Sequence, residues 1–334
     1  MFIPNNSISE IEPFELSGTL IKEITIPEGV TTIDSSAFSG SIMEKITFPS
    51  TLYSVGSYAF EGIPCTSIKF SHVNTLYDSC FIGSNIKYIE LPPSISTIGS
   101  NCFYNISLET LILPLTSNYL YIDSFAFAFL TFTNFTIPDN TYHISEQVFR
   151  GCVIEEMIIP GSLSYFGNWT FTDCLIDECI MKSGITNLQE YSLAMSDIIK
   201  LEIPSSLTKI DQFAFMSCAV EEIVIPNYCN VSNNAFEDCY NLKRVTIGEG
   251  CIIGANAFYK CYSLIELVAY DSISFTNNAF GSISKSIAIK YLGTSDSSIS
   301  STISNFKQIA SIVNVTCNYP SSTFCGMSVN KLPC

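Results

Sequence analysis

Residues 24–38 read Ile24-Thr25-Ile26-Pro27-Glu28-Gly29-Val30-Thr31-Thr32-Ile33-Asp34-Ser35-Ser36-Ala37-Phe38, and versions of this stretch recur along nearly the whole chain. The proline position of the repeat advances by 21 to 24 residues at each step. It is occupied by Pro27, Pro49, Ser71, Pro92, Pro114, Pro138, Pro160, Lys182, Pro204, Pro226, Gly248 and Tyr270. Self-similarity at such a period predicts a solenoid, because one short repeat cannot bury its apolar face alone and must stack on its neighbours.

Apolar residues precede the proline position at fixed distances. In most repeats they lie six, three and one positions before it, as Ile21, Ile24 and Ile26 do before Pro27. The Ile-x-Ile alternation predicts a strand of three to five residues that ends at the proline position, because proline has no N–H to donate to a neighbouring strand. Successive strands of this kind should lie parallel and side by side.

A second apolar column follows the proline position by about ten residues. It is occupied by Phe38, Phe60, Phe81, Phe103, Phe127, Phe149, Phe171, Leu193, Phe215, Phe236, Phe258 and Phe280. Another apolar residue lies five positions before this Phe position, as Ile33 does before Phe38. We therefore expect this segment to form the opposite wall of each coil, with the ring filling the interior.

Phrases such as residues 24–38 resemble the BspA-like leucine-rich repeat family, and the resemblance covers residues 20–290. It implies a right-handed leucine-rich repeat solenoid of about 12 repeats of about 22 residues, in which short parallel strands form a curved concave sheet. The convex side would consist mostly of loops, turns and short helical segments. Members of this family are surface and adhesion-type proteins of anaerobic bacteria and parasitic protists. The resemblance therefore implies binding to proteins or to other cells, but no particular partner, because repeat folds host many ligands.

The composition favours a folded protein that binds other proteins. Apolar residues make up 47% of the chain, and only 14% of the residues are charged, which is typical of folded rather than disordered chains. The formal net charge is −16 at pH 7, whereas a partner such as DNA or RNA requires a basic surface. We therefore expect protein partners and no nucleic acid.

The sequence shows no targeting signal and no transmembrane segment. The first residues, Met1 to Asn6, carry neither a cationic stretch nor a continuous apolar run, so no secretory signal is expected. No stretch approaches the roughly eighteen continuous apolar residues of a membrane span. These observations point to the cytoplasm, whereas the family resemblance points to the cell surface. The sequence leaves both compartments open.

Motifs for catalysis or metal binding are also missing from the sequence. It contains only two histidines, His72 and His143, and neither belongs to a nucleophile or metal motif. No phosphate-binding glycine loop and no Cys-x-x-Cys pair occurs. Adjacent carboxylates such as Glu221 and Glu222 recur just before the predicted strand, which indicates a solvated surface rather than an acid-base pair. We therefore expect no enzymatic activity, no cofactor and no metal ion.

Fourteen cysteines are present, and several of them repeat at one position. Those three residues after the Phe position are Cys152, Cys174, Cys218, Cys239 and Cys261. A repeated position indicates packing, and free cysteine is among the most buried residue types, so we expect buried thiols. Consecutive members of the column would also lie about one coil apart, close to the distance that a disulfide requires. A ladder of disulfides is therefore the alternative.

The outward residues of the predicted strands vary most between repeats. Four positions before the proline position they are mixed and polar, and two positions before it they become largely apolar and β-branched from Ile112 onward. β-Branched residues suit any exposed strand, but an apolar stripe flanked by acidic residues is also typical of a protein-binding surface. The candidate binding residues on the concave sheet are Ile112, Thr136, Glu156, Ile158, Glu178, Ile180, Glu222, Val224, Thr246 and Val268.

The two ends of the chain depart from the repeat. We expect a degenerate part-repeat at residues 1–20, the solenoid at 21–290, and a C-terminal cap and tail at 291–334, with a short helix near 298–310 and a strand at 312–317. The first coil begins partway through a repeat, and an uncapped strand edge can pair with another chain. The alternative function is therefore an intracellular scaffold or cytoskeleton-associated component that associates end-on at this N-terminal edge, with itself or with another protein.

Overall fold

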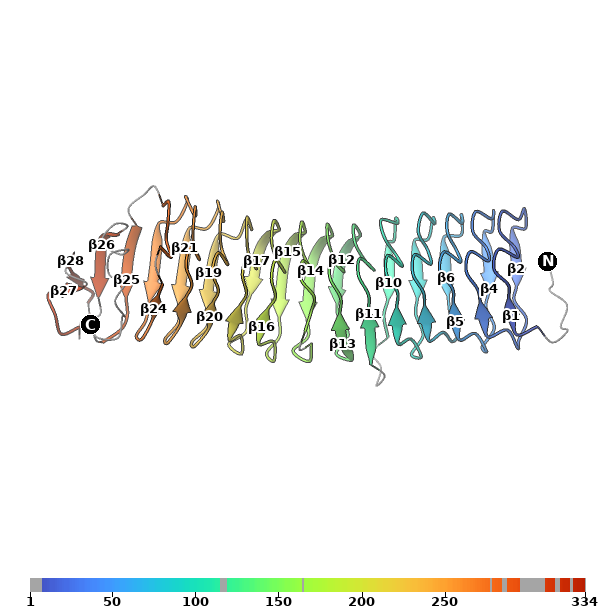
Figure 1. Cartoon of the computed structure of the whole chain (residues 1–334), viewed down its shortest axis with the longest axis horizontal. Coiled ribbons are helices and arrows are strands. Elements are labelled where there is room, and N and C mark those ends of the chain that lie inside the picture. The colour runs from blue at the N-terminus through green and yellow to red at the C-terminus, as the bar shows by residue number, and fades with distance from the viewer. Residues whose placement is uncertain are drawn as a thin grey trace. The chain divides into compact units, whose positions relative to one another are not determined.

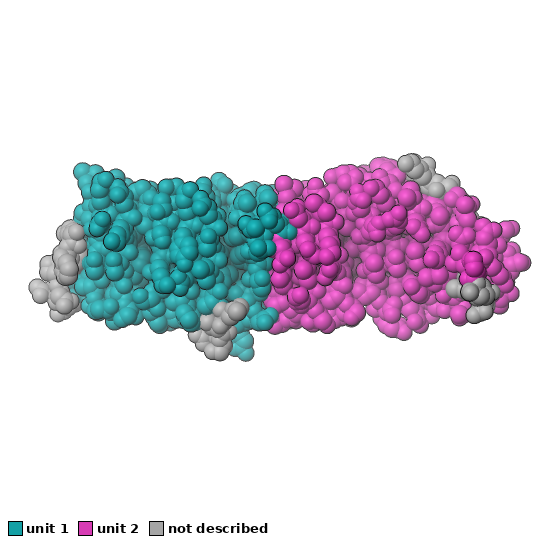
Figure 2. Space-filling view, turned by 180° about the vertical axis from the view of Figure 1, so that it is seen from behind, with its two compact units in different colours: residues 1–155, 165–171 teal, residues 156–164, 172–334 magenta. Residues whose placement is uncertain are grey.

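The computed structural model describes residues 8–114, 119–163, 165–276, 278–283, 287–294, 310–315, 319–324 and 327–333. The chain divides into two compact units (Figure 2): unit 1 comprises Met1–Glu155 and Tyr165–Phe171, and unit 2 comprises Glu156–Ser164 and Thr172–Cys334. Within each unit the strands that end at the proline position form the front wall. The strands that precede the Phe position form the back wall.

Unit 1 has parallel strands in both walls (Figure 1). The front-wall strands are β2 (Glu23–Thr25), β4 (Lys45–Thr47), β6 (Ser67–Lys69), β8 (Tyr88–Glu90), β10 (Thr110–Ile112) and β12 (Thr131–Thr136). β2 pairs with β4, and β6, β8 and β10 form one sheet. The back wall is a seven-stranded sheet of β1 (Glu10–Ile11), β3 (Thr32–Ile33), β5 (Ser54–Val55), β7 (Thr75–Leu76), β9 (Thr97–Ile98), β11 (Leu120–Ile122) and β13 (Thr141–Ile144). β14 (Val153–Ile159) runs across the division between the units.

Unit 2 repeats this arrangement and adds strands near the C-terminus. Its front-wall strands are β15 (Leu175–Met181), β17 (Asp197–Glu202), β19 (Glu222–Ile225), β21 (Arg244–Ile247), β23 (Glu266–Ala269) and β25 (Ile287–Tyr291). Its back wall is the five-stranded sheet of β16 (Asn187–Leu188), β18 (Lys209–Ile210), β20 (Asn230–Val231), β22 (Ile252–Ile253) and β24 (Ser274–Phe275). β26 (Ala310–Val315) and β29 (Asn330–Lys331) extend the sheet beyond β25, and β27 (Thr323–Phe324) pairs with β28 (Met327–Ser328) as an antiparallel hairpin.

The front-wall strands alternate between the core and the solvent. In β19, Ile223 and Ile225 are buried, whereas Glu222 and Val224 are exposed. Ile223 pairs with Val245 of the next coil, 22 residues later. A constant repeat length keeps equivalent residues in line, so the inward columns form a continuous core within the unit. The alternation predicted from the sequence is confirmed.

The rings at the Phe position stack along the interior of each unit. In unit 1, neighbouring rings from Phe38 to Phe171 have centroids 5.3 to 5.7 Å apart. In unit 2, those from Phe215 to Phe280 lie 4.7 to 5.1 Å apart. All of these rings are buried, and parallel offset contacts of this kind stabilise a core beyond the area that they remove from water. The Phe column therefore fills the interior, as predicted.

The turns that carry the Phe position contain left-handed residues instead of helix. Ser36 and Gly40 flank Phe38 with φ angles of 54° and 64°, and the other coils repeat this pattern. The amides of Ser36, Phe38 and Gly40 donate to carbonyls of the next coil, whereas those of Ala37 and Ser39 bond back three residues within their own coil. A left-handed residue cannot continue a right-handed helix. The short helical segments implied by the resemblance are therefore absent from the described ranges, where turns and strands of two to four residues replace them.

Two expectations about the extent of elements need correction. β12 and β17 contain six residues and β14 and β15 contain seven, more than the predicted three to five. In these coils the extended backbone already begins seven residues before the proline position. The strand expected at residues 312–317 is β26, Ala310–Val315. The helix expected near 298–310 lies outside the described residues except for Ala310, which begins β26.

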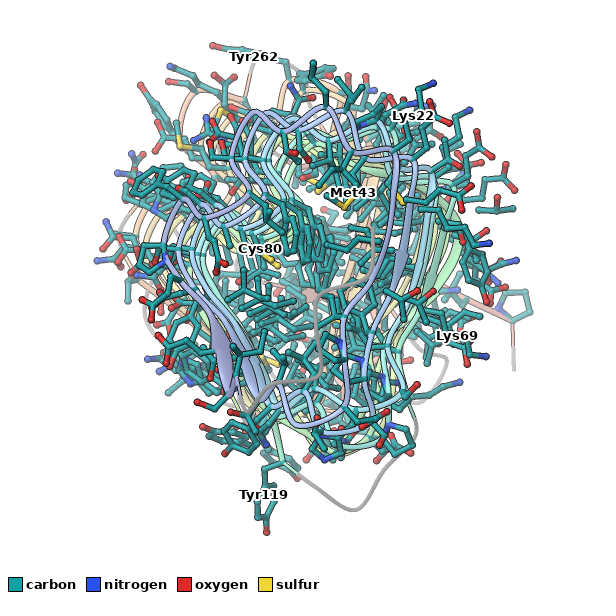
Figure 3. The ribbon with its side chains drawn as sticks, turned by 90° about the vertical axis from the view of Figure 1, so that its right-hand side faces the viewer. Lys22, Met43, Lys69, Cys80, Tyr119 and Tyr262 are labelled. Carbon is teal, nitrogen blue, oxygen red and sulfur yellow. The ribbon has the colours of Figure 1, made fainter. Side chains whose placement is uncertain are left out.

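The eleven cysteines in the part of the chain that the structure describes are all buried and unbridged. In unit 1, Cys80 and Met43 point into the interior of the coil, whereas Lys22 and Lys69 point outward (Figure 3). The expectation of buried thiols is confirmed for these residues. Cys317, Cys325 and Cys334 lie outside the described residues.

We expect Cys152, Cys179 and Cys218 to resist alkylation in the folded protein. Burial raises the pKa of each thiol to about 12, so the reactive thiolate is scarce at neutral pH. Iodoacetamide treatment followed by peptide mass spectrometry should leave these residues unmodified in native buffer and should modify them fully in urea. Disulfide-linked peptides from these positions would contradict the buried thiols and would support the ladder.

Candidate partner-binding surface

The outward residues of β19, β21 and β23 form an apolar row on the front wall of unit 2. Val224 pairs with Thr246, and Thr246 pairs with Val268 of the following strand. Val224 is 63% exposed, whereas Thr246 and Val268 are half-buried. Lys290 follows Val268 on β25 and ends the row with a charge. Three of the predicted residues are thus brought together.

Ile158 on β14 and Ile180 on β15 form a separate group. Both are half-buried and occupy the same position of their coils. Ile180 pairs with Glu202 of β17, and β17 belongs to a different sheet from β19. The structure therefore does not bring Ile180 next to Val224. The apolar candidates of unit 2 occupy two groups with a polar strand between them.

Two predicted residues lie in unit 1. Ile112, on β10, is 42% exposed, and Thr136, on β12, is also exposed. β10 and β12 belong to different sheets, so no ladder pairs these residues.

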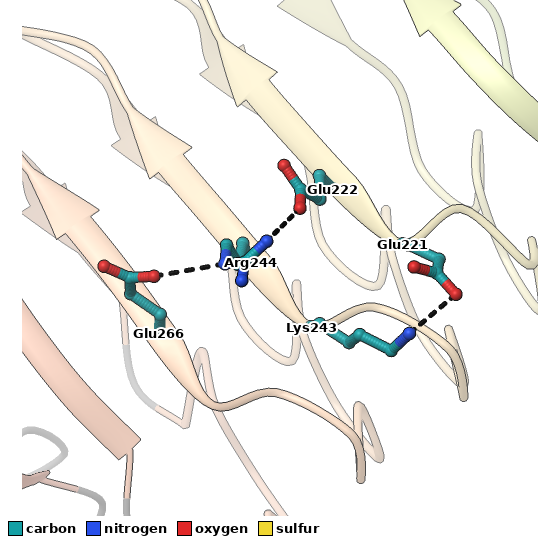
Figure 4. Close-up of polar contacts among 5 residues, drawn as sticks. All are labelled: Glu221, Glu222, Lys243, Arg244 and Glu266. Carbon is teal, nitrogen blue, oxygen red and sulfur yellow. Dashed lines mark hydrogen bonds and ion pairs between the residues drawn. The ribbon is translucent and has the colours of Figure 1, made fainter.

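Charged residues on β19, β21 and β23, or directly before β19 and β21, form ion pairs (Figure 4). Arg244 contacts the Glu222 carboxylate, and its Nε lies 3.2 Å from the Glu266 carboxylate. The side-chain hydrogen bond with Glu222 is the largest cause of the raised pKa of Arg244. The Nζ atom of Lys243 lies 2.7 Å from the Glu221 carboxylate. Pairs this exposed contribute little to stability, but they fix where each charge lies on the surface.

The remaining acidic candidates lie on β14 and β15. Glu156 and Glu178 are half-buried. Lys200 of β17 contacts Glu178, and its Nζ lies 3.0 Å from the Glu202 carboxylate. The hydrogen bond with Glu178 and then that with Glu202 raise the pKa of Lys200. β17 therefore presents a lysine paired with two carboxylates between the two apolar groups.

Sequence reasoning missed Ile199 as a surface residue. It is 75% exposed on β17 and lies five positions before the proline position, where most repeats carry a charged or polar residue such as Glu221 or Lys243. An isoleucine in a column of charged residues was the signal that could have found it. The same reasoning treated Arg244 and Glu266 as variable polar positions and did not recognise their pairing.

The two histidines have ordinary environments in unit 1. The Nδ1 atom of His72 lies 2.9 Å from the Leu52 carbonyl oxygen. The ring of His143 stacks between those of Tyr121 and Tyr165, at centroid distances of 4.9 and 5.5 Å. Within the described residues, no three His, Cys, Asp or Glu side chains are grouped closely enough to hold a metal ion. No helix in those residues has the length and hydropathy required to cross a membrane.

Comparison with protein families gives a match over most of the chain. The model described as "BspA type Leucine rich repeat region (6 copies)" matches residues 9–126, 120–243 and 227–329. The chain belongs to this family. The BspA-type leucine-rich repeat explains why the proline and Phe positions recur together, since both are parts of one coil. No curated protein matches the chain in sequence.

Comparison with solved structures also gives matches to this member of the family. A leucine-rich repeat protein from Bacteroides ovatus is 24% identical with a TM-score of 0.61, and the alignment covers 87% of this chain and 82% of that one. The pneumococcal vaccine antigen PcpA is 18% identical with a TM-score of 0.44, over 97% and 83% of the two chains. A leucine-rich cell surface protein from Faecalibacterium prausnitzii is 21% identical with a TM-score of 0.33, over 81% and 65%. The Bacteroides ovatus structure supports the fold alone, because its identity to this chain is low.

Proposed function

We propose that this BspA-type leucine-rich repeat protein is a non-catalytic module that binds another protein through the front wall of unit 2. The observation that carries the proposal is the row of Val224, Thr246 and Val268 beside the ion pairs of Arg244. A protein-binding surface requires two things, and this arrangement supplies both. Burial of the apolar strip favours binding, and the charges in fixed positions orient the partner. Extended surfaces of repeat proteins commonly serve this purpose.

The charge of the chain favours a basic partner surface. The formal net charge is −16, and the carboxylates of Glu221, Glu222 and Glu266 outnumber the cations of Lys243 and Arg244 in the ion pairs at β19 to β23. Opposite charges accelerate the encounter of two proteins and orient them before contact. The partner is therefore a protein whose contact surface carries lysine or arginine around an apolar centre. Such recognition fits adhesion or surface recognition, the role that we favour.

Replacing Ile158, Ile180 and Val224 together by Ser should abolish partner capture. The three side chains lie on the outward face of their strands, so their loss removes apolar contact area from the interface but little from the core. Each truncation of an interface anchor typically weakens binding severalfold or more. The amount of partner retained from an extract of the native cells, measured by quantitative mass spectrometry, should fall to background.

A matched variant controls for the loss of exposed apolar surface. Replacing Ile252, Tyr240 and Tyr262, which are 49%, 52% and 43% exposed outside the front wall of unit 2, by Ser should leave capture unchanged. Both triple variants should keep the far-ultraviolet circular dichroism of the parent. Equal capture by the parent and the front-wall variant would rule out the proposed surface.

A further inference from the structure

The front wall of unit 2 is interrupted between β17 and β19. β17 pairs with β15 and β19 pairs with β21, but no ladder joins β17 to β19. On either side of the gap the coils remain bonded: the Ala219 amide donates to the Ser196 carbonyl at 2.9 Å, and the Asn230 amide donates to the Thr208 carbonyl at 2.8 Å. The gap is therefore confined to the front wall.

Backbone hydrogen bonds that join the coils of β19 and β21 have no equivalent between the coils of β17 and β19. The Lys243 amide donates to the Glu221 carbonyl at 2.7 Å, but the equivalent bond from the Glu221 amide to the Ile199 carbonyl is not formed between these described residues. A second backbone hydrogen bond between the coils is missing because Pro226 occupies the position of its donor. Gly248 occupies the same position one coil later and its amide donates to the Ile225 carbonyl at 3.0 Å, whereas proline has no N–H to donate. The facing edges of β17 and β19 thus keep unused donors and acceptors.

The gap opens into a groove of about 590 Å³, within the range of sites that hold a ligand. Carboxylates of Asp197, Glu221 and Glu222 line it, and Lys200 is the only cation among its described lining residues. Lys200 is paired with Glu178 and Glu202, and Glu221 and Glu222 are paired with Lys243 and Arg244. With Asp197 and Glu266 included, six carboxylates accompany three cations around the groove. The exposed side chain of Ile199 adds an apolar contact at the same place. The groove is therefore acidic at its surface. It also has apolar lining residues, among them the exposed Ile199 and the buried Ile198 and Val220, and two polar backbone edges.

We propose that this groove binds an extended segment of the partner protein by strand addition, and that the segment carries lysine or arginine side chains alternating with apolar ones. The inference rests on the proposed function, because it specifies the binding mode and the partner chemistry of the same wall. Unpaired strand edges are templates for another strand. In strand addition, main-chain hydrogen bonds supply affinity and alternate side chains supply specificity. The side chains of an added strand alternate between its two faces. Here the basic ones meet Asp197 and Glu221 on the outward face, and the apolar ones face Ile198 and Val220, which are buried lining residues of the groove.

The free edges can be tested without any ligand. Hydrogen exchange followed by mass spectrometry with electron-transfer fragmentation should show the Glu221 amide exchanging at least tenfold faster than the Lys243 amide, which is hydrogen-bonded. Equal protection of the two amides would mean that the wall is closed in solution and would overturn the proposal.

A peptide probe tests the binding mode. A fluorescein-labelled hexapeptide of alternating lysine and valine should bind and should slow exchange of the amides of β17 and β19. The same peptide with its valine amides methylated keeps its charge but cannot donate hydrogen bonds from those amides. Its affinity should be at least about tenfold weaker, given the usual contribution of three hydrogen bonds. A hexapeptide of alternating glutamate and valine should not bind. Equal affinity of the methylated and unmethylated peptides would show charge attraction without strand addition and would refute the proposal.

Charge-neutral variants locate the peptide. Replacing Asp197 by Asn together with Glu221 by Gln should weaken lysine-valine peptide binding about fivefold or more, as expected when two surface charges are removed. Glu249→Gln removes one carboxylate from an exposed turn in the same unit and should change the affinity less than twofold. Similar losses in both variants would place the peptide elsewhere on the acidic surface and would reject the groove.

Failure of this inference is distinguishable from failure of the proposed function. If the peptide does not bind but the substitutions of Ile158, Ile180 and Val224 still abolish partner capture, the groove is not the site and the front wall still is. If the substitutions of those three residues also leave capture unchanged, both proposals fall.

Discussion

Phe236→Ala is expected to lower the free energy of unfolding by about 3 to 5 kcal/mol, the usual cost of deleting a buried aromatic ring. Phe236 is fully buried, and its ring stacks between those of Phe215 and Phe258 at centroid distances of 4.7 and 5.1 Å. The substitution leaves a cavity and removes two stacking contacts at once. Because a solenoid coil contacts only its neighbours, the loss falls on both interfaces of one coil. Urea unfolding followed by circular dichroism measures the effect.

Two comparison variants distinguish the effect of losing a stacked, buried ring from the effect of losing any aromatic side chain. Tyr240→Ala removes a ring that is 52% exposed and should change stability by no more than about 0.5 kcal/mol. Phe236→Leu keeps an apolar side chain, as Leu193 does at the equivalent position of another coil, and should cost less than about 1.5 kcal/mol. A Phe236→Ala protein as stable as Tyr240→Ala would show that the ring stack does not hold the coils together.

Stability should fall steeply as the pH rises above about 9. Burial raises the pKa of Cys179 and Cys218 to about 12 in the folded state, from the ordinary thiol value of 9.0. Between these values the unfolded chain loses thiol protons that the folded chain keeps, so the free energy of unfolding decreases with pH. The stabilisation is fully present below pH 9 and is lost towards pH 12. The slope is about 1.4 kcal/mol per pH unit for each thiol, and the two thiols together lose about 4 kcal/mol by pH 10.5.

The slope of the unfolding free energy between pH 9 and 11 identifies the groups that cause the loss of stability. The double variant Cys179→Ala, Cys218→Ala starts from a lower stability because of lost packing, but its unfolding free energy should decline less steeply between pH 9 and 11. Val220→Ala also truncates a buried side chain of unit 2 and should keep the slope of the parent. Identical slopes in the parent and the double cysteine variant would exclude these thiols as the cause.

The sequence predicted the repeat, its two walls and the interior Phe column, because each depends on apolar residues at fixed spacing. Ile223 and Ile225 alternate with polar or exposed neighbours, and Phe236 repeats at the spacing of one coil. The left-handed turns could not be predicted in this way. The residues at that position include Ser36, Tyr58 and Phe125, which do not ordinarily favour positive φ. The hydrogen bonds that each coil makes to the next impose the conformation and override local preference.

The candidate site was predicted only in part, since a column in the sequence does not show which strands pair. Val224, Thr246 and Val268 lie together because β19, β21 and β23 form one sheet. Ile180 occupies the same column but lies beside Glu202, and the gap after β17 separates it from Val224. The gap has no clear sequence signal, because Pro226 resembles the proline of many paired coils. Which strands pair depends on the packing of whole coils rather than on the residues of one repeat.

The central claim is that the front wall of unit 2 contacts the partner, and site-specific photocrosslinking tests it most directly. A benzoylphenylalanine placed at Thr246, on the outward face of β21, should crosslink to the partner protein on illumination. The same group placed at Ser274, on β24 of the back wall, should not. Crosslinking from Ser274 without crosslinking from Thr246 would contradict the account.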